Sequence, residues 1–213
     1  MGFLPHPGVP KPQGGPVLRH WRFDGTDPLK NWEEKVFKGK TLFRVSSRPG
    51  GNYLHVESAD ACSGLFVKTE AVSGLFLRWR WRATEFPAKK KHELSNRGED
   101  DFAARVYAIF PANNFFHSDV IEYIWDEKSS PGTCADSAYS DRIKLLVLRA
   151  GPASSEDQGW RSEHRNIYED YLKLFGRKPH YAVGMIAVMS DSDSTGSGSA
   201  ADFGEIILKR KNT

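Results

Sequence analysis

Three short segments place polar side chains on one face of a predicted strand, and these side chains are the first candidates for chemistry. The segments are Leu75–Ala83, Phe102–Phe110 and Val120–Asp126, and successive side chains of a strand point to opposite faces. The polar residues that share a face are Arg78, Arg80 and Arg82 in the first segment, Arg105 and Tyr107 in the second, and Glu122 and Asp126 in the third. If the three strands are sheet neighbours, these groups converge on one polar surface.

Arginine and tyrosine on a sheet face are suited to binding a polyol or a carboxylated sugar, because a guanidinium offers forked hydrogen-bond donors. The predicted ligand-binding residues are Arg78, Arg80, Arg105, Tyr107, Glu122 and Trp160. Trp160 lies in a predicted loop beside Arg161, where it would either stack on a sugar or anchor the loop in the core. The alternative is a solvated face whose cross-strand Arg–Glu pairs each contribute less than about 1 kcal/mol.

An enzyme would use the same face. Some jelly-roll polysaccharide lyases neutralise a uronate with arginine and tyrosine, which is an analogy of fold alone. Glycoside hydrolases need two carboxylates about 5 to 9.5 Å apart. The predicted pair is Asp101 and Glu122, with Arg105 and Tyr107 beside it. The sequence has no G-x-S-x-G elbow, no P-loop, no dinucleotide fingerprint and no H-E-x-x-H motif.

A second candidate site begins at Asp191, where a Ser/Asp/Gly-rich stretch follows an apolar segment. Oxygen-bearing side chains at spacings close to those of a calcium loop predict the metal ligands Asp191, Asp193, Thr195 and Asp202. Gly196 stands where such loops turn sharply. The flanking segments read as strands rather than helices, so a plain turn is the alternative to a bound Ca²⁺.

Short β-like runs separated by turn residues predict a mainly β protein, an antiparallel β-sandwich of jelly-roll type. Trp79, Trp81 and Trp125 fall on apolar strand faces and are expected in the core. Further predicted strands are Val17–Phe23, Gly64–Lys68, Ile143–Arg149, Val183–Met189 and Phe203–Lys209, with a hairpin formed by Thr41–Ser46 and Tyr53–Ser58. One helix is predicted in the C-terminal third, with Asn166 as its N-cap and Gly176 at its end.

Composition bears on the partners, membrane association and domain organisation of the protein. Thirty Lys and Arg against 27 Asp and Glu give a net charge of +3, which does not favour a nucleic-acid partner. No run of apolar residues is long enough for a membrane helix. Residues 1–16 are rich in Pro and Gly and are expected to be a flexible leader before one domain over 17–213. Cys62 and Cys134 either form one disulfide or are two unrelated thiols.

Several segments, in this order, resemble a bacterial family known only as domain of unknown function three-zero-four-seven. They are Leu77–Trp81, Gly98–Tyr107, Ile121–Trp125, Gly159–Trp160, Arg165–Tyr171, Phe175–Gly176, Ile186–Thr195 and Phe203–Ile206. The resemblance spans roughly residues 20 to 208 and carries no known activity or site residues. It implies export, to the periplasm or outside the cell.

The sequence thus predicts an exported β-sandwich whose function is to bind a glycan or small polyol without catalysis, with Ca²⁺ as a candidate cofactor. A polysaccharide lyase or glycoside hydrolase using the Arg/Tyr/carboxylate face is one alternative. A structural envelope protein is another, and it predicts a large apolar patch with no concave polar pocket.

Overall fold

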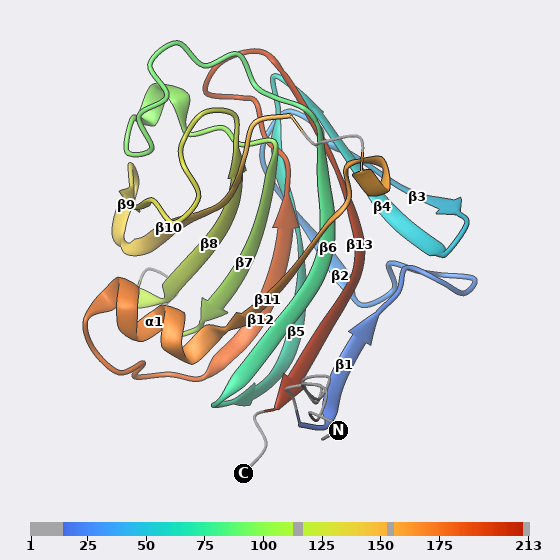
Figure 1. Cartoon of the computed structure of the whole chain (residues 1–213), viewed down its shortest axis with the longest axis vertical. Coiled ribbons are helices and arrows are strands. Elements are labelled where there is room, and N and C mark those ends of the chain that lie inside the picture. Colours follow the sequence, from blue (N-terminus) through green and yellow to red (C-terminus); the bar gives the residue numbers. More distant parts are fainter. Residues whose placement is uncertain (1–14, 113–116, 153–155, 211–213) are drawn as a thin grey trace, which may run out of the picture.

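The computed structural model describes residues 15–112, 117–152 and 156–210, which form two β-sheets packed face to face (Figure 1). Most of the predicted leader, residues 1–14, lies outside the described residues. The mainly β, sandwich-like architecture confirms the predicted fold class.

Sheet A has six strands. Five run in the order β11 (Arg161–Asn166), β6 (Leu75–Glu85), β13 (Gly198–Arg210), β4 (Gly51–Ala59) and β3 (Leu42–Arg48), and β1 (Val17–Trp21) also pairs with β13. Every pairing in this sheet is antiparallel. The hairpin predicted around Gly50 and Gly51 is present as β3 and β4.

Sheet B has seven strands. Their order is β2 (Trp32–Lys38), β5 (Cys62–Val72), β12 (Val183–Met189), β7 (Ala104–Phe110), β8 (Asp119–Asp126), β10 (Ser140–Ala150) and β9 (Cys134–Ser137). The pairing of β8 with β10 is parallel, and the other pairings are antiparallel.

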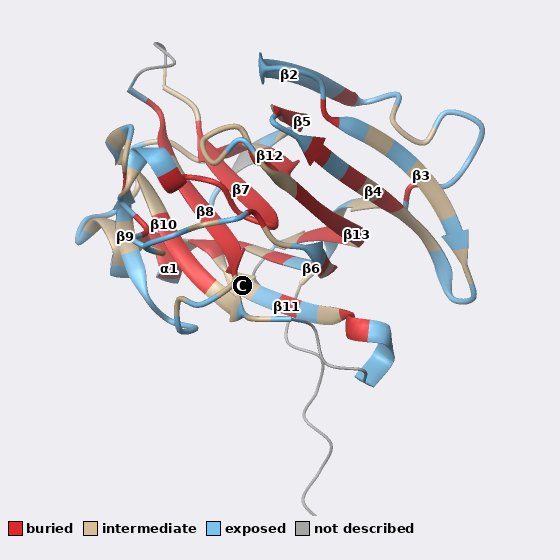
Figure 2. Ribbon diagram, turned by 90° about the horizontal axis from the view of Figure 1, so that it is seen from above, coloured by how far each residue is buried: buried red, intermediate tan, exposed pale blue. Residues whose placement is uncertain are grey.

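The core lies between the sheets and is rich in tryptophan. Trp79 and Trp81 of β6 are fully buried and face Tyr123 and Trp125 of β8, with ring centroids 5.2 and 5.6 Å apart. The predicted core positions of these tryptophans are confirmed. Burial is concentrated on β7, β8, β12 and β13, while β2 is largely exposed and β3 is exposed to half-buried (Figure 2).

The helix α1 (Ile167–Phe175) forms where local signals predict it. The Asn166 side chain accepts a hydrogen bond from the Glu169 N–H, and the chain leaves the helix at Gly176 with a φ of +66°. Tyr171 packs its ring against Phe110 of β7, with centroids 4.7 Å apart. The helix therefore covers one end of the sandwich, beside β7 and β8.

One predicted strand start is wrong. The strand predicted over Phe102–Phe110 begins later than expected, because β7 begins at Ala104. Phe102 belongs to a separate cluster with Leu94, Ile124, Leu145 and Val147, on the outer side of sheet B. The segment before β7 therefore folds over that outer face and covers part of it.

Candidate functional site

A cleft crosses the outer face of sheet B. It is a cavity of about 360 Å³, and each of the seven strands contributes at least one residue to its lining. Phe37 of β2 and Ser137 of β9, which belong to the two edge strands, line the same cavity as Tyr107 and Glu122 of the central strands. Seven flat strands would span about 29 Å. Both edges can border one cavity only because the sheet curls around it.

Arg105 organises the acidic end of this cleft. Its Nε and Nη2 donate to the two carboxylate oxygens of Asp191 at 2.8 and 2.5 Å, and its Nη1 donates to Glu122 Oε2 at 3.0 Å. Nη2 also donates to the backbone carbonyl of Asp100, whose carboxylate lies 3.7 Å from Nη1. Arg105 is 3% exposed. Its donors are therefore occupied by protein groups, and they link Asp191, Glu122 and the backbone of Asp100.

The carboxyl groups around Arg105 hold their protons more tightly than usual. Burial raises the pKa of Glu122 to about 8 and that of Asp191 to about 7, although the nearby Arg105 charge opposes both shifts. Burial likewise raises the pKa of Asp100. The cleft lining contains four carboxyl groups, those of Asp100, Glu122, Asp191 and Asp193, and one guanidinium. The effect of burial on these pKa values exceeds the effect of the Arg105 charge, because one guanidinium cannot compensate the desolvation of several carboxylates.

The rest of the cleft is mainly apolar and aromatic. Phe66, Ile109, Val120 and Met189 line it, and the Tyr107 hydroxyl donates to Met189 Sδ at 3.3 Å. Burial holds the pKa of Tyr107 well above its ordinary value, so its phenol stays protonated. Tyr107 therefore contributes a ring and a neutral hydroxyl to the cleft, not a proton-accepting phenolate.

Asp101 does not face the cleft. Its carboxylate is fully buried and accepts hydrogen bonds from the Ser194 N–H at 3.1 Å, the Thr195 N–H at 2.7 Å and the Thr195 hydroxyl at 2.7 Å. It holds the loop after β12 in place. Asp191, and not Asp101, shares the Arg105 guanidinium with Glu122.

The arginines of β6 lie on the opposite side of the molecule. β6 belongs to sheet A, whereas β7 and β8 belong to sheet B, and the outer faces of the two sheets point away from each other. Arg78 and Arg80 therefore cannot share a surface with Glu122, which corrects the expected single polar face. Arg80 Nη2 pairs with Asp157 Oδ2 at 2.6 Å.

Trp160 is also on the side of sheet A. It is 2% exposed, and the Arg48 guanidinium covers its ring at 4.1 Å from the centroid. Tyr53 packs against it edge-on, with centroids 5.7 Å apart. Of the two readings of Trp160, the structure favours loop anchoring over sugar stacking.

The four predicted metal ligands do not converge. Asp191 pairs with Arg105, Asp193 lines the cleft, and Thr195 bonds to Asp101. Asp202 lies within β13 of sheet A, where it accepts from His55 Nδ1 at 2.7 Å and Arg82 Nε at 2.6 Å. Calcium binding by this loop stays a prediction, and Asp202 is held away from the other three residues.

The two cysteines are separate thiols in the structure. Cys62 opens β5 and lines the cleft, whereas Cys134 is exposed on β9. Sequence reasoning connected neither cysteine with the Asp191 loop. The pairing of β5 with β12 brings Cys62 close to the residues that follow β12.

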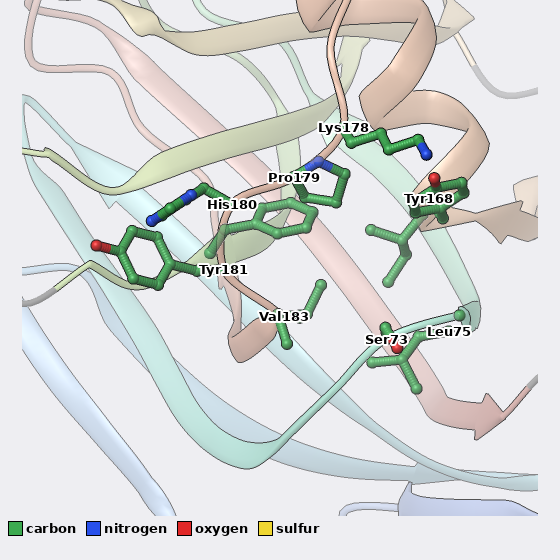
Figure 3. Close-up of a pocket in the computed structure, with 12 residues that line it drawn as sticks. Ser73, Leu75, Tyr168, Lys178, Pro179, His180, Tyr181 and Val183 are labelled. Carbon is green, nitrogen blue, oxygen red and sulfur yellow. The ribbon is translucent and has the colours of Figure 1, made fainter.

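A smaller cavity of about 270 Å³ opens at one end of the sandwich (Figure 3). Its apolar floor includes Leu75 and Val183, and Tyr168, Lys178 and His180 lie around it. Its described lining contains no carboxylate. Of these two cavities, the cleft on sheet B therefore holds the denser set of groups that could do chemistry.

The family of the chain is decided by a match over residues 30–207 to the model described as "Protein of unknown function (DUF3047)". The chain belongs to this family. The match runs from the turn before β2 into β13, and it includes the cleft residues Arg105, Glu122 and Asp191. The resemblance noted from the sequence is confirmed for DUF3047, and the family itself assigns no activity to the cleft.

Solved structures show distant similarity only. They include the xyloglucanase domain of NopAA, a type three effector from Sinorhizobium fredii, with a TM-score of 0.44, 12% identity, and coverage of 81% of this chain and 90% of that one. The K1 cleaved adhesin domain of Lys-gingipain from Porphyromonas gingivalis W83 has a TM-score of 0.41, 12% identity, and coverage of 91% and 98%.

Other similar structures are much longer than this chain. The Spr0440 glycoside hydrolase domain of Endo-D from Streptococcus pneumoniae R6 has a TM-score of 0.38 and 11% identity; the match covers 85% of this chain but 22% of that one. Among curated proteins, none matches the chain in sequence. Within the described residues, no helix has the length and apolar character needed to cross a bilayer.

Proposed function

We propose that the chain binds a neutral glycan or polyol in the cleft on sheet B. The observation that carries this proposal is a single curved cavity that combines aromatic side chains with carboxylates. Sugars present apolar C–H faces that pack on aromatic rings, and hydroxyls that donate to carboxylates. Phe37 and Tyr139 are 53% and 55% exposed, and they border the cavity on β2 and on the turn between β9 and β10.

The hydrogen bonding of Arg105 favours an uncharged ligand over a uronate. Four carboxyl groups line it, and the donors of Arg105 are already bound to Asp191, Glu122 and Asp100. A carboxylated sugar would therefore find no uncommitted lysine or arginine among the described residues that line the cleft. For the same reason, the polysaccharide lyase alternative finds no arginine available to neutralise a uronate.

The expected ligand contacts change accordingly. Tyr107 and Glu122 are still proposed to contact the ligand. Arg105 binds Glu122 and fixes the position of its carboxyl group. Arg78, Arg80 and Trp160 lie on the side of sheet A, outside this cleft. A concave cleft with carboxyl groups at one end also counts against a purely structural envelope protein, which predicts no such cleft.

Affinity electrophoresis through gels containing neutral or uronate-rich polysaccharides tests this proposal. Binding to a neutral polysaccharide is expected, and Tyr139→Ala should weaken it about tenfold, in line with the loss of roughly 1 kcal/mol or more of ring packing. The matched control is Arg78→Ala, an exposed change on sheet A, which should leave migration unchanged. Retardation by uronate polymers alone, or sensitivity to Arg78→Ala but not to Tyr139→Ala, would contradict this placement.

A glycoside hydrolase is the second candidate function, and one observation favours it. Glu122 lines the cleft and has a pKa raised to about 8, so it would be a protonated acid at neutral pH. Glu122 and Asp191 have oxygens within 3.0 Å of nitrogens of one guanidinium. Their facing oxygens therefore lie within the upper limit of about 9.5 Å that glycosidases use.

Release of reducing ends from a bound polysaccharide separates the two functions. A hydrolase would lose this release in Glu122→Gln while keeping gel retardation. A binding module would show retardation and no release.

Export, which the family resemblance implies, is also proposed, and fractionation of cells that express the full-length protein would test it.

A further inference from the structure

Three potential metal donors meet at the acidic end of the cleft. The Cys62 Sγ and one carboxylate oxygen each from Asp191 and Asp193 all lie within 4.8 Å of one another. The fold brings them together because β5 begins at Cys62 and pairs with β12, and the two aspartates follow β12 directly. Zinc binds thiolate and carboxylate ligands at about 2.0 to 2.3 Å, so small side-chain rotations would allow all three donors to contact one ion.

A buried carboxylate oxygen without a hydrogen-bond partner lies at the same end of the cleft. Asp100 lines the same cavity and is 6% exposed, and its Oδ1 is buried with no hydrogen-bond partner. An unsatisfied buried carboxylate oxygen is costly. A cation bound at this end of the cleft would reduce that cost through its field, without direct coordination by Asp100.

One of the three donors is uncommitted. Among the described residues, the Asp193 carboxylate accepts no hydrogen bond; only its backbone carbonyl does, from Lys38 Nζ at 3.0 Å. Asp191 uses both oxygens toward Arg105 and accepts the Phe102 N–H at 3.0 Å, and this fixes its orientation. The hydrogen bonds to Asp191 would orient it as a metal ligand, since groups around a metal site commonly orient its ligands in this way. The Asp193 carboxylate is available to bind the same ion.

The donor chemistry selects the metal. Calcium and magnesium take oxygen ligands, whereas a cysteine thiolate favours softer ions such as zinc. We propose that Cys62, Asp191 and Asp193 bind one Zn²⁺ ion at the acidic end of the cleft. Zn²⁺ replaces the thiol proton of Cys62, which passes to solvent. Three protein ligands leave a fourth position for water or a ligand hydroxyl, as in catalytic zinc sites.

This site does not depend on glycan binding, and the free metal tests it. The full chain is treated with EDTA, dialysed and titrated with Co²⁺, whose bond to a thiolate gives a charge-transfer absorption in the near ultraviolet. One equivalent of Co²⁺ is expected to produce this absorption, and one equivalent of Zn²⁺ to abolish it. Excess Ca²⁺ should leave it unchanged.

Variants assign the ligands. Cys62→Ser should remove the absorption, and Asp193→Asn should weaken Zn²⁺ binding more than about tenfold, the lower range seen when groups around a metal are changed. Asp193 is only partly buried, so its variant keeps the test decisive if Cys62→Ser does not fold. The exposed Cys134→Ser is the matched control and should behave as wild type.

Three results would overturn the proposal. They are absence of the thiolate absorption in the wild-type chain, its loss in Cys134→Ser but not in Cys62→Ser, and unchanged Zn²⁺ affinity in Asp193→Asn. Displacement of Co²⁺ by Ca²⁺ at comparable concentration would overturn the assignment to zinc.

Discussion

Arg105 and Glu122 lie on adjacent strands of sheet B, and Arg105 Nη1 donates to Glu122 Oε2 at 3.0 Å in a site where both residues are buried. The same guanidinium holds Asp191, which lies 86 residues further along the chain. The acidic end of the cleft is therefore built around one arginine that joins β7, β8 and the loop after β12.

Removal of the Arg105 charge should destabilise the protein strongly. Arg105→Met leaves Glu122, Asp191 and Asp100 without their counter-charge, and loss of one partner from a buried ion pair typically costs about 3–5 kcal/mol. Urea unfolding measures this loss. The exposed Arg78→Met of sheet A is the control and should change stability by less than about 0.5 kcal/mol. Equal losses of unfolding free energy in the two variants would show that the buried ion pairs of Arg105 add no stability beyond that of an exposed arginine.

Stability should fall as pH rises from about 5 to 8. Glu122 has a folded pKa of about 8, above its ordinary value of 4.5, so between these values the folded state binds the proton that the unfolded state has lost. Stability from this group is complete below the unfolded pKa and disappears as pH rises through the folded one.

Glu122→Gln should flatten this pH dependence, because the amide does not titrate. Denaturant unfolding at a series of pH values, with EDTA present, measures the slope. Glu34→Gln, an exposed change on β2 of the same sheet, is the control and should retain the wild-type slope. A wild-type slope in Glu122→Gln would contradict the assignment of the raised pKa to Glu122.

Asp101→Asn should loosen the loop after β12 without opening the core. The change weakens the bonds that the carboxylate accepts from Ser194 and Thr195, and a hydrogen bond to a charged group contributes about 1.5–3 kcal/mol. Amide hydrogen exchange should speed up at residues 193–196 and stay slow in β7 and β12. Unchanged exchange in the loop would show that Asp101 does not hold it.

The tryptophan pair of β6 should matter for stability more than any side chain on the outer face of that strand. Trp79→Ala removes a fully buried ring that packs against Tyr123, and such changes typically cost about 3–5 kcal/mol. Arg78→Ala, one position earlier on the same strand, points outward and serves as the comparison. Thermal or urea unfolding of the two variants measures the difference.

Local sequence determined much of the fold. Alternation in Leu75–Ala83 separated buried tryptophans from outward arginines, because a strand directs successive side chains to opposite faces. Asn166 and Gly176 set the helix ends through hydrogen bonds and a backbone conformation that involve only nearby residues. The strands β2, β9 and β11 were missed. All three are edge strands without a clear apolar alternation: β2 is largely exposed, β9 has four residues, and β11 consists of polar and charged residues.

The sequence alone determined the candidate site only in part. The sequence showed that Arg105, Tyr107 and Glu122 point away from the core, since that follows from strand period alone. It could not show which sheet each strand joins, because strand pairing is set by contacts between distant segments. The tertiary structure therefore decided that Arg78 and Arg80 face the other way, that Asp101 serves a loop, and that Cys62 and Asp191 meet beside Arg105.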